Sequence, residues 1–171
     1  MMITKKIQDA FNKQINAETY SAYLYWSMSA GLEEINLPGF ANWMRVQAQE
    51  EMTHAVKFYN HIIERGGRVE LTAIDGPPIE WASAKAVFEA GLKHEQLVTS
   101  LINGLVDLVT VEKDHAANMF LQWFVTEQVE EEANAMDVLG KLEIVGATAG
   151  GLYMLDKEMG QRVFVPPVAQ A

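Results

Sequence analysis

The residues best suited to do chemistry lie in the stretch Gln49-Glu50-Glu51-Met52-Thr53-His54. It falls in the middle of a run, about 38–65, whose apolar residues recur with the period of an α-helix. Glu51 and His54 are three residues apart, so their side chains project side by side from the apolar face. An ionised carboxylate on such a face is costly unless a partner neutralises it. His54 could be that partner, and so could a cation bound by both side chains.

Three more runs with helical period each place a carboxylate on an apolar face. These are Glu18 in about 4–34, Glu95 in about 83–110 and Glu131 in about 114–146. At about 1.5 Å of rise per residue, all four carboxylates reach similar depths. The apolar faces of these runs offer no Lys or Arg to pair with them, so bound metal ions are the simplest source of positive charge. Many oxygen donors with one imidazole suit Fe, Mn or Zn.

The long irregular segment 68–81 determines how these helices can be connected. At about 3.3 Å per residue it can span about 45 Å, and a helix of about 27 residues is about 40 Å long. It can therefore cross the whole bundle and make the second and third helices parallel. We expect an all-α, ferritin-like four-helix bundle over about 4–146, with a long crossover between helices 2 and 3. A short fifth helix over about 152–162 and a loose tail, 163–171, complete one domain, 1–171.

Composition excludes several classes of function. The 171 residues are 49% hydrophobic and carry a net charge of −10, which argues against a nucleic-acid partner. There is no cysteine, so thiolate metal sites and disulfides are impossible. No apolar run approaches the roughly 20 residues that would cross a membrane, and the chain enters an amphipathic helix almost at once. We expect a cytoplasmic protein with no membrane association.

Four motifs resemble those of the non-haem ferritins of bacteria and archaea, and together they extend over almost the whole chain. They are Ile15-Asn16-Ala17-Glu18, Gln49-Glu50-Glu51-Met52-Thr53-His54, Phe120-Leu121-Gln122-Trp123 and Thr126-Glu127-Gln128-Val129-Glu130-Glu131. Each falls on the helix, and at the depth, that the spacing of the carboxylates already required.

The resemblance implies a di-iron ferroxidase centre. The positions that match the ligands of one iron are Glu18, Glu51 and His54; those that match the ligands of the second are Glu51, Glu95 and Glu131, with Glu51 bridging. Gln128 matches the glutamine beside the pair, and Tyr25 a nearby tyrosine that can donate an electron. A third, weaker iron site of prokaryotic ferritins corresponds to Glu50, Glu127 and Glu130.

The same resemblance implies iron storage. Members of this family oxidise Fe²⁺ with dioxygen or hydrogen peroxide and deposit ferric mineral inside a hollow homo-oligomer, usually of 24 subunits. Bacterioferritins carry His at the position of Glu131, and Met52 also fits non-haem ferritins, so no haem is expected.

Two alternatives of other kinds stay open from the sequence. One is a ferritin-like di-iron oxidase or peroxidase without a storage role, such as a rubrerythrin-like protein. The other is a purely structural bundle whose carboxylates, including the acidic run 127–132, face water. His61 and His94 are expected to face water in either case.

Overall fold

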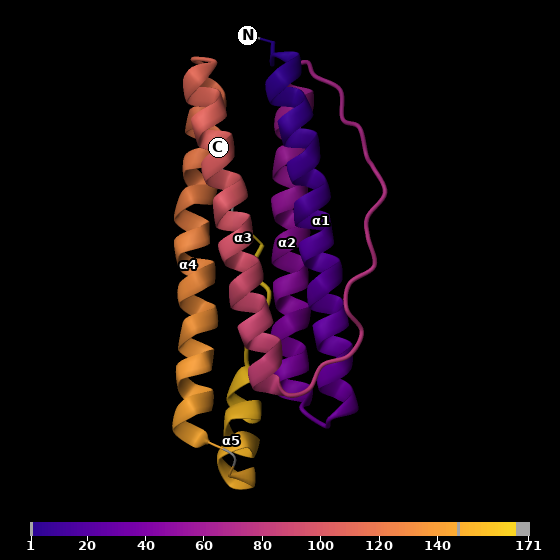
Figure 1. The fold of residues 1–171 in the computed structure, drawn as a ribbon, viewed down its shortest axis with the longest axis vertical. Coiled ribbons are helices and arrows are strands. Elements are labelled where there is room, and N and C mark those ends of the chain that lie inside the picture. The colour runs from indigo at the N-terminus through magenta and orange to yellow at the C-terminus, as the bar shows by residue number, and fades with distance from the viewer. Residues whose placement is uncertain (1, 147, 167–171) are drawn as a thin grey trace.

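The computed structural model describes residues 2–146 and 148–166, and these residues form helices and connecting segments without strands (Figure 1). The helices are α1 (Lys5–Glu34), α2 (Pro38–Glu64), α3 (Ala84–Val111), α4 (His115–Val145) and α5 (Ala149–Met159). The first four form the bundle and α5 packs at one end of it. The predicted all-α, ferritin-like fold is therefore confirmed.

Local chemistry explains where the long helices begin. The side chains of Thr4, Ser83 and Asp114 accept hydrogen bonds from backbone N–H groups in the first turns of α1, α3 and α4. Helix α2 opens with Pro38, whose fixed φ suits a first helical position, but it has no side-chain cap of its own. Asp156 of α5 supplies one instead, since its Oδ1 accepts from the Phe40 N–H at 3.0 Å.

The crossover between α2 and α3 runs along the outside of the bundle from one end to the other (Figure 1). Helices α1 and α2 are antiparallel, and the crossover returns the chain to the end where α2 began, so α2 and α3 are parallel. Asn12 holds the crossover through the Arg68 carbonyl at 3.0 Å and the Glu70 N–H at 2.9 Å. One turn later, Asn16 donates to Thr72 Oγ1 at 2.8 Å. The predicted long crossover is confirmed.

The core consists of two apolar clusters, one toward each end of the bundle. One cluster includes Phe40, Met44, Phe88 and Leu142, and the other includes Phe11, Phe58, Ile102, Leu121 and Phe124. Each fully buried side chain of this size stabilises the fold by roughly 1.5–3 kcal/mol. The buried polar side chains Glu18, Glu51, Glu95 and Glu131 belong to neither cluster. The rigid apolar packing on both sides is what can position a polar centre accurately.

Helix α5 begins and ends three residues earlier than the predicted 152–162. Gly150 and Gly151 fall outside the predicted bounds, yet both lie in the first turn of the helix. A Cβ at Gly151 would lie 2.9 Å from the Val145 Cβ, so glycine permits a close return of the chain after α4. The helix ends at Met159, with Gly160 as its C-cap. Of the predicted tail, 163–166 is irregular and 167–171 lies outside the described residues.

Among the described residues, no helix combines the length and the apolar character needed to cross a membrane.

Candidate metal centre

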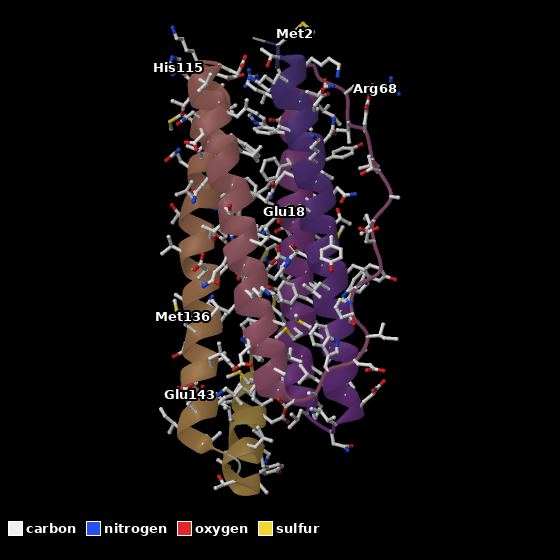
Figure 2. All side chains as sticks on the ribbon, in the orientation of Figure 1. Met2, Glu18, Arg68, His115, Met136 and Glu143 are labelled. Atoms are coloured by element: carbon white, nitrogen blue, oxygen red, sulfur yellow. The ribbon has the colours of Figure 1, made fainter. Side chains whose placement is uncertain are left out.

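Carboxylates from all four bundle helices, together with His54, converge in one buried layer. Glu18, Glu51 and His54 offer ligand atoms that lie within 4.8 Å of one another, and so do Glu51, Glu95 and Glu131. Figure 2 labels Glu18 at about mid-height in the bundle. Both groups are buried, and they share Glu51. One carboxylate common to two ligand groups is the arrangement that a bridged pair of metal ions requires.

Glu18 has one satisfied and one unsatisfied oxygen. Gln14, one turn earlier on α1, donates to its Oε1 at 2.9 Å. Its Oε2 is buried without a hydrogen-bond partner among the described residues. Buried carboxylate oxygens are almost always bonded, and this oxygen faces the ligand layer, with His54 Nδ1 4.0 Å away. A free carboxylate oxygen in this position fits a metal ligand.

Glu51 is held by two neighbours on its own helix. Gln47 Nε2 donates to its Oε1 at 3.0 Å, and His54 Nδ1 lies 3.2 Å from its Oε2. The same Gln47 amide donates to Glu131 Oε2 at 2.7 Å. One amide thus orients two carboxylates from different helices, which is how ligands are held in place around many metal sites.

Glu95 is anchored on the opposite side of the layer. The Tyr25 hydroxyl donates to its Oε1 through a short hydrogen bond. Gln128 Nε2 donates to its Oε2 and to its backbone carbonyl, both at 3.2 Å. Tyr25 and Gln128 therefore lie beside the layer and hold Glu95 in place.

Burial raises the pKa of three carboxyls in this metal-free layer. The pKa of Glu18 rises to about 7 and that of Glu131 to about 8, mainly through burial and, for Glu131, through the neighbouring charge of Glu51. Burial and the charges of Glu51 and Glu131 also hold the pKa of Glu95 well above its ordinary value. These raised pKa values mean that the carboxyls hold protons near neutral pH.

Glu51 and His54 shift in the opposite sense because each stabilises the charge of the other. Burial alone would raise the pKa of Glu51, but the charge of His54 lowers it below its ordinary value. Burial alone would lower the pKa of His54, but Glu51 and Glu127 raise it well above 6.5. An imidazole binds metal only when its ligand nitrogen has lost its proton, so a metal ion would displace a proton here.

The structure places the three positions of the expected third site differently from one another. Glu127 Oε1 lies 3.8 Å from His54 Nε2, and Glu127 forms a further ligand group with His54 and Glu131. Glu50 forms an ion pair with Arg162, and Glu130 is exposed. Among the described residues, the three side chains do not form a single ligand group.

Sequence reasoning missed three residues that support the centre: Gln14, Gln47 and Arg162. The sequence spacing could have indicated the two glutamines, because each precedes a candidate ligand by four residues, a spacing at which helical side chains touch. No sequence spacing indicates Arg162, because it follows α5 and approaches the centre only in the folded bundle.

His61 and His94 do not face water as expected. The His61 ring stacks on Phe120 with centroids 4.0 Å apart, and its Nε2 is buried without a partner among the described residues. His94 Nε2 lies 2.7 Å from Ser21 Oγ. Each ring contacts a neighbouring helix: His61 packs on Phe120 of α4, and His94 lies against Ser21 of α1.

A four-helix bundle with a shared carboxylate between two buried ligand groups defines the class of ferritin-like di-metal proteins. The sequence model of the ferritin-like domain family matches residues 8–145. The chain belongs to the ferritin family.

Similar proteins with known structures or curated descriptions are also ferritins. The bacterial non-heme ferritin of Bacteroides fragilis is 44% identical over 161 residues, which are 94% of this chain and 100% of that protein. The bacterial non-heme ferritin of Staphylococcus saprophyticus is 40% identical, over 95% of this chain and 98% of that protein. An open-pore ferritin from Archaeoglobus fulgidus superposes with a TM-score of 0.93 at 52% identity, over 94% and 99% of the two chains.

These matches confirm the resemblance to prokaryotic non-haem ferritins. Iron storage is the function that this family membership supports.

Proposed function

We propose that this protein oxidises Fe²⁺ at a di-iron centre and stores the ferric product in the cavity of a hollow oligomer. The observation that carries the proposal is the position of Glu51, which is common to two buried ligand groups. One ion would bind to Glu18, Glu51 and His54, and the other to Glu51, Glu95 and Glu131.

The ligand set suits iron that enters as Fe²⁺ and leaves as Fe³⁺. Four carboxylates and one imidazole neutralise the charge of two ferrous ions and stabilise the ferric state more strongly. Each ferrous ion gives one electron to dioxygen, which takes up two protons and becomes hydrogen peroxide. The ferric ions then hydrolyse and release protons as they enter the mineral. With hydrogen peroxide as the oxidant, the same two electrons reduce it to water.

Residues around the ligands have separate tasks. Gln47 orients Glu51 and Glu131, and Gln128 orients Glu95. The Tyr25 hydroxyl, which donates to Glu95, is close enough to the centre to supply an electron during oxidation. Burial raises the pKa of Tyr25 well above 10, so the phenol keeps its proton at rest.

Storage requires an enclosed volume that one bundle cannot provide, and we therefore include assembly in the proposal. A shell of 24 chains is the expected form. The third site would use Glu50, Glu127 and Glu130 to take an ion that leaves or approaches the pair, and no haem is required for any step.

Aerobic addition of Fe²⁺ to the iron-free protein tests the proposal. We expect fast oxidation of two ions per chain, followed by soluble loading far beyond two. Oxidation that stops at two ions per chain would favour a ferritin-like di-iron oxidase or peroxidase without storage. No acceleration over protein-free buffer would leave only a structural bundle.

A further inference from the structure

Arg162 is held against α2 by the segment that follows α5. Asn42 Nδ2 donates to the Arg162 carbonyl at 2.9 Å and fixes the backbone there. The guanidinium lies over the Trp43 ring, 4.0 Å from its centroid. Asp156 ties α5 itself to the start of α2. The side chain is therefore positioned by contacts on both sides and not merely by its own charge.

The guanidinium makes two polar contacts that lead into the candidate centre. Its Nη2 donates to Glu50 Oε2 in a short ion pair. Its Nη1 donates to Gln47 Oε1 at 2.8 Å, and the same amide donates to Glu51 and Glu131. Arg162 is thus the positive partner of Glu50. It is connected to the shared carboxylate, Glu51, through the Gln47 side chain.

This ion pair is more than a surface contact. The side chains of Arg162 and Glu50 are only 19% and 23% exposed. The guanidinium also donates to Gln47 Oε1 and to the Trp43 carbonyl, and it packs on the Trp43 ring. Partly buried, charge-assisted bonds of this kind are stronger than exposed ion pairs. A metal ion that uses Glu50 as a ligand must compete with a charge already in place.

We propose that Arg162 determines how many metal ions the centre takes, because its guanidinium holds Glu50 and admits a third ion only when displaced. This proposal rests on the proposed function because it assumes that the centre binds two metal ions. It does not depend on iron oxidation. Loss of the positive charge at Arg162 should make Glu50 available and strengthen the binding of a third ion.

Titration of the iron-free, assembled protein with Co²⁺ tests this without redox chemistry. Visible absorption and equilibrium dialysis report the number and affinity of the bound ions. We expect wild type to bind two ions tightly and a third weakly. In Arg162→Gln, the third ion should bind at least about fivefold more tightly, the lower end of typical coupling between two ligands. Arg68→Gln is the matched control, since it removes the same charge from an exposed side chain of the crossover.

A double variant separates competition at Glu50 from a general change of charge or structure. Glu50→Gln combined with Arg162→Gln should lose the gain, because the ligand that the guanidinium covers is then absent. Arg162→Lys keeps the charge but cannot reach Glu50 and Gln47 with two parallel donors, so its third ion should bind with intermediate affinity. Arg162→Lys also tests the proposal if Arg162→Gln fails to assemble.

Equal third-ion affinity in wild type and Arg162→Gln would overturn the proposal, and so would a gain that persists in the double variant. Failure of the proposed function has a different signature, namely no tight pair of ions in wild type.

Discussion

Glu18 Oε2 lies 4.0 Å from His54 Nδ1, too far for a hydrogen bond, although both atoms belong to buried side chains from neighbouring helices. The same nitrogen lies nearer to Glu51 Oε2, at 3.2 Å, so the imidazole gives no hydrogen bond to Glu18. Glu18 Oε2 is left without a hydrogen-bond partner among the described residues, although folding normally pairs such an atom. Burial raises the pKa of Glu18 and of Glu131, so these carboxyls carry protons near neutral pH that a bound cation would displace.

Binding of metal should release protons, and the number released should fall as the pH rises. The pKa of Glu18 is about 7 and that of Glu131 about 8, so at pH 6 both carboxyls retain most of their protons. At pH 9 both have already lost them. Calorimetric titration with Co²⁺ in buffers of different ionisation enthalpy measures the release. A release that is the same at both pH values would contradict the protonated layer.

Glu18→Gln should stabilise the metal-free protein at pH 8. The folded pKa of Glu18 is raised to about 7, so its favourable state is complete below the unfolded pKa, near 4.3, and is lost as the pH rises through 7. A glutamine cannot ionise and avoids this loss. Denaturant unfolding at pH 5 and pH 8 should show a clearly larger advantage at the higher pH, because the loss grows between the unfolded and the folded pKa. Glu34→Gln, an exposed change on the same helix, should be neutral at both.

Glu51→Ala should slow the rapid oxidation of the first two Fe²⁺ by at least about 100-fold, because it removes a ligand from both ions. Stopped-flow absorption after mixing with aerobic Fe²⁺ measures the rate. Glu64→Ala, an exposed change on α2, serves as the control and should oxidise iron like wild type. A wild-type rate in Glu51→Ala would show that the centre lies elsewhere.

Acid should destabilise the protein partly through His61. Burial lowers the pKa of His61 to about 4, so the stability that its neutral ring contributes is complete above the unfolded pKa of about 6.5 and is lost as the pH falls toward 4. His61→Phe preserves the stacking on Phe120 without a titratable nitrogen. Its unfolding midpoint should fall less than that of wild type between pH 7.5 and pH 4.5. His115→Gln, at an exposed site, should retain the wild-type pH dependence.

Assembly should bury apolar side chains that a single chain exposes. Leu71 and Ile79 of the crossover are 74% and 82% exposed, and Val56 of α2 is 50% exposed. Size-exclusion chromatography with light scattering should give about 24 × 19.1 ≈ 458 kDa. Leu71→Lys should shift the protein toward smaller species, because it places a charge on an exposed apolar position that assembly would bury. A wild-type monomer at every salt concentration would remove the storage proposal.

The helices and the depth of the four carboxylates were predictable because both follow from local rules. The apolar period marked the inward faces of α1 to α4, and a rise of about 1.5 Å per residue set how far along each helix Glu18, Glu51, Glu95 and Glu131 lie. The length of the segment 68–81 was enough to imply the crossover. The predicted bounds of the fifth helix left out Gly150 and Gly151, because glycine has a low helix propensity, yet both lie in its first turn. A Cβ at Gly151 would lie 2.9 Å from the Val145 Cβ, so that position favours glycine for a steric reason.

What the tertiary structure alone decided is which side chains meet between helices. Gln47 precedes Glu51 by one helical turn, but only the packed bundle shows its amide on both Glu51 and Glu131. It also shows Arg162 beside Glu50, more than 100 positions away in the chain. Contacts between neighbours on one helix repeat with a fixed period, so they can be predicted from the spacing of residues in the sequence. Contacts made through a turn, a crossover and a terminal segment depend on where the whole chain closes, and no single stretch encodes that.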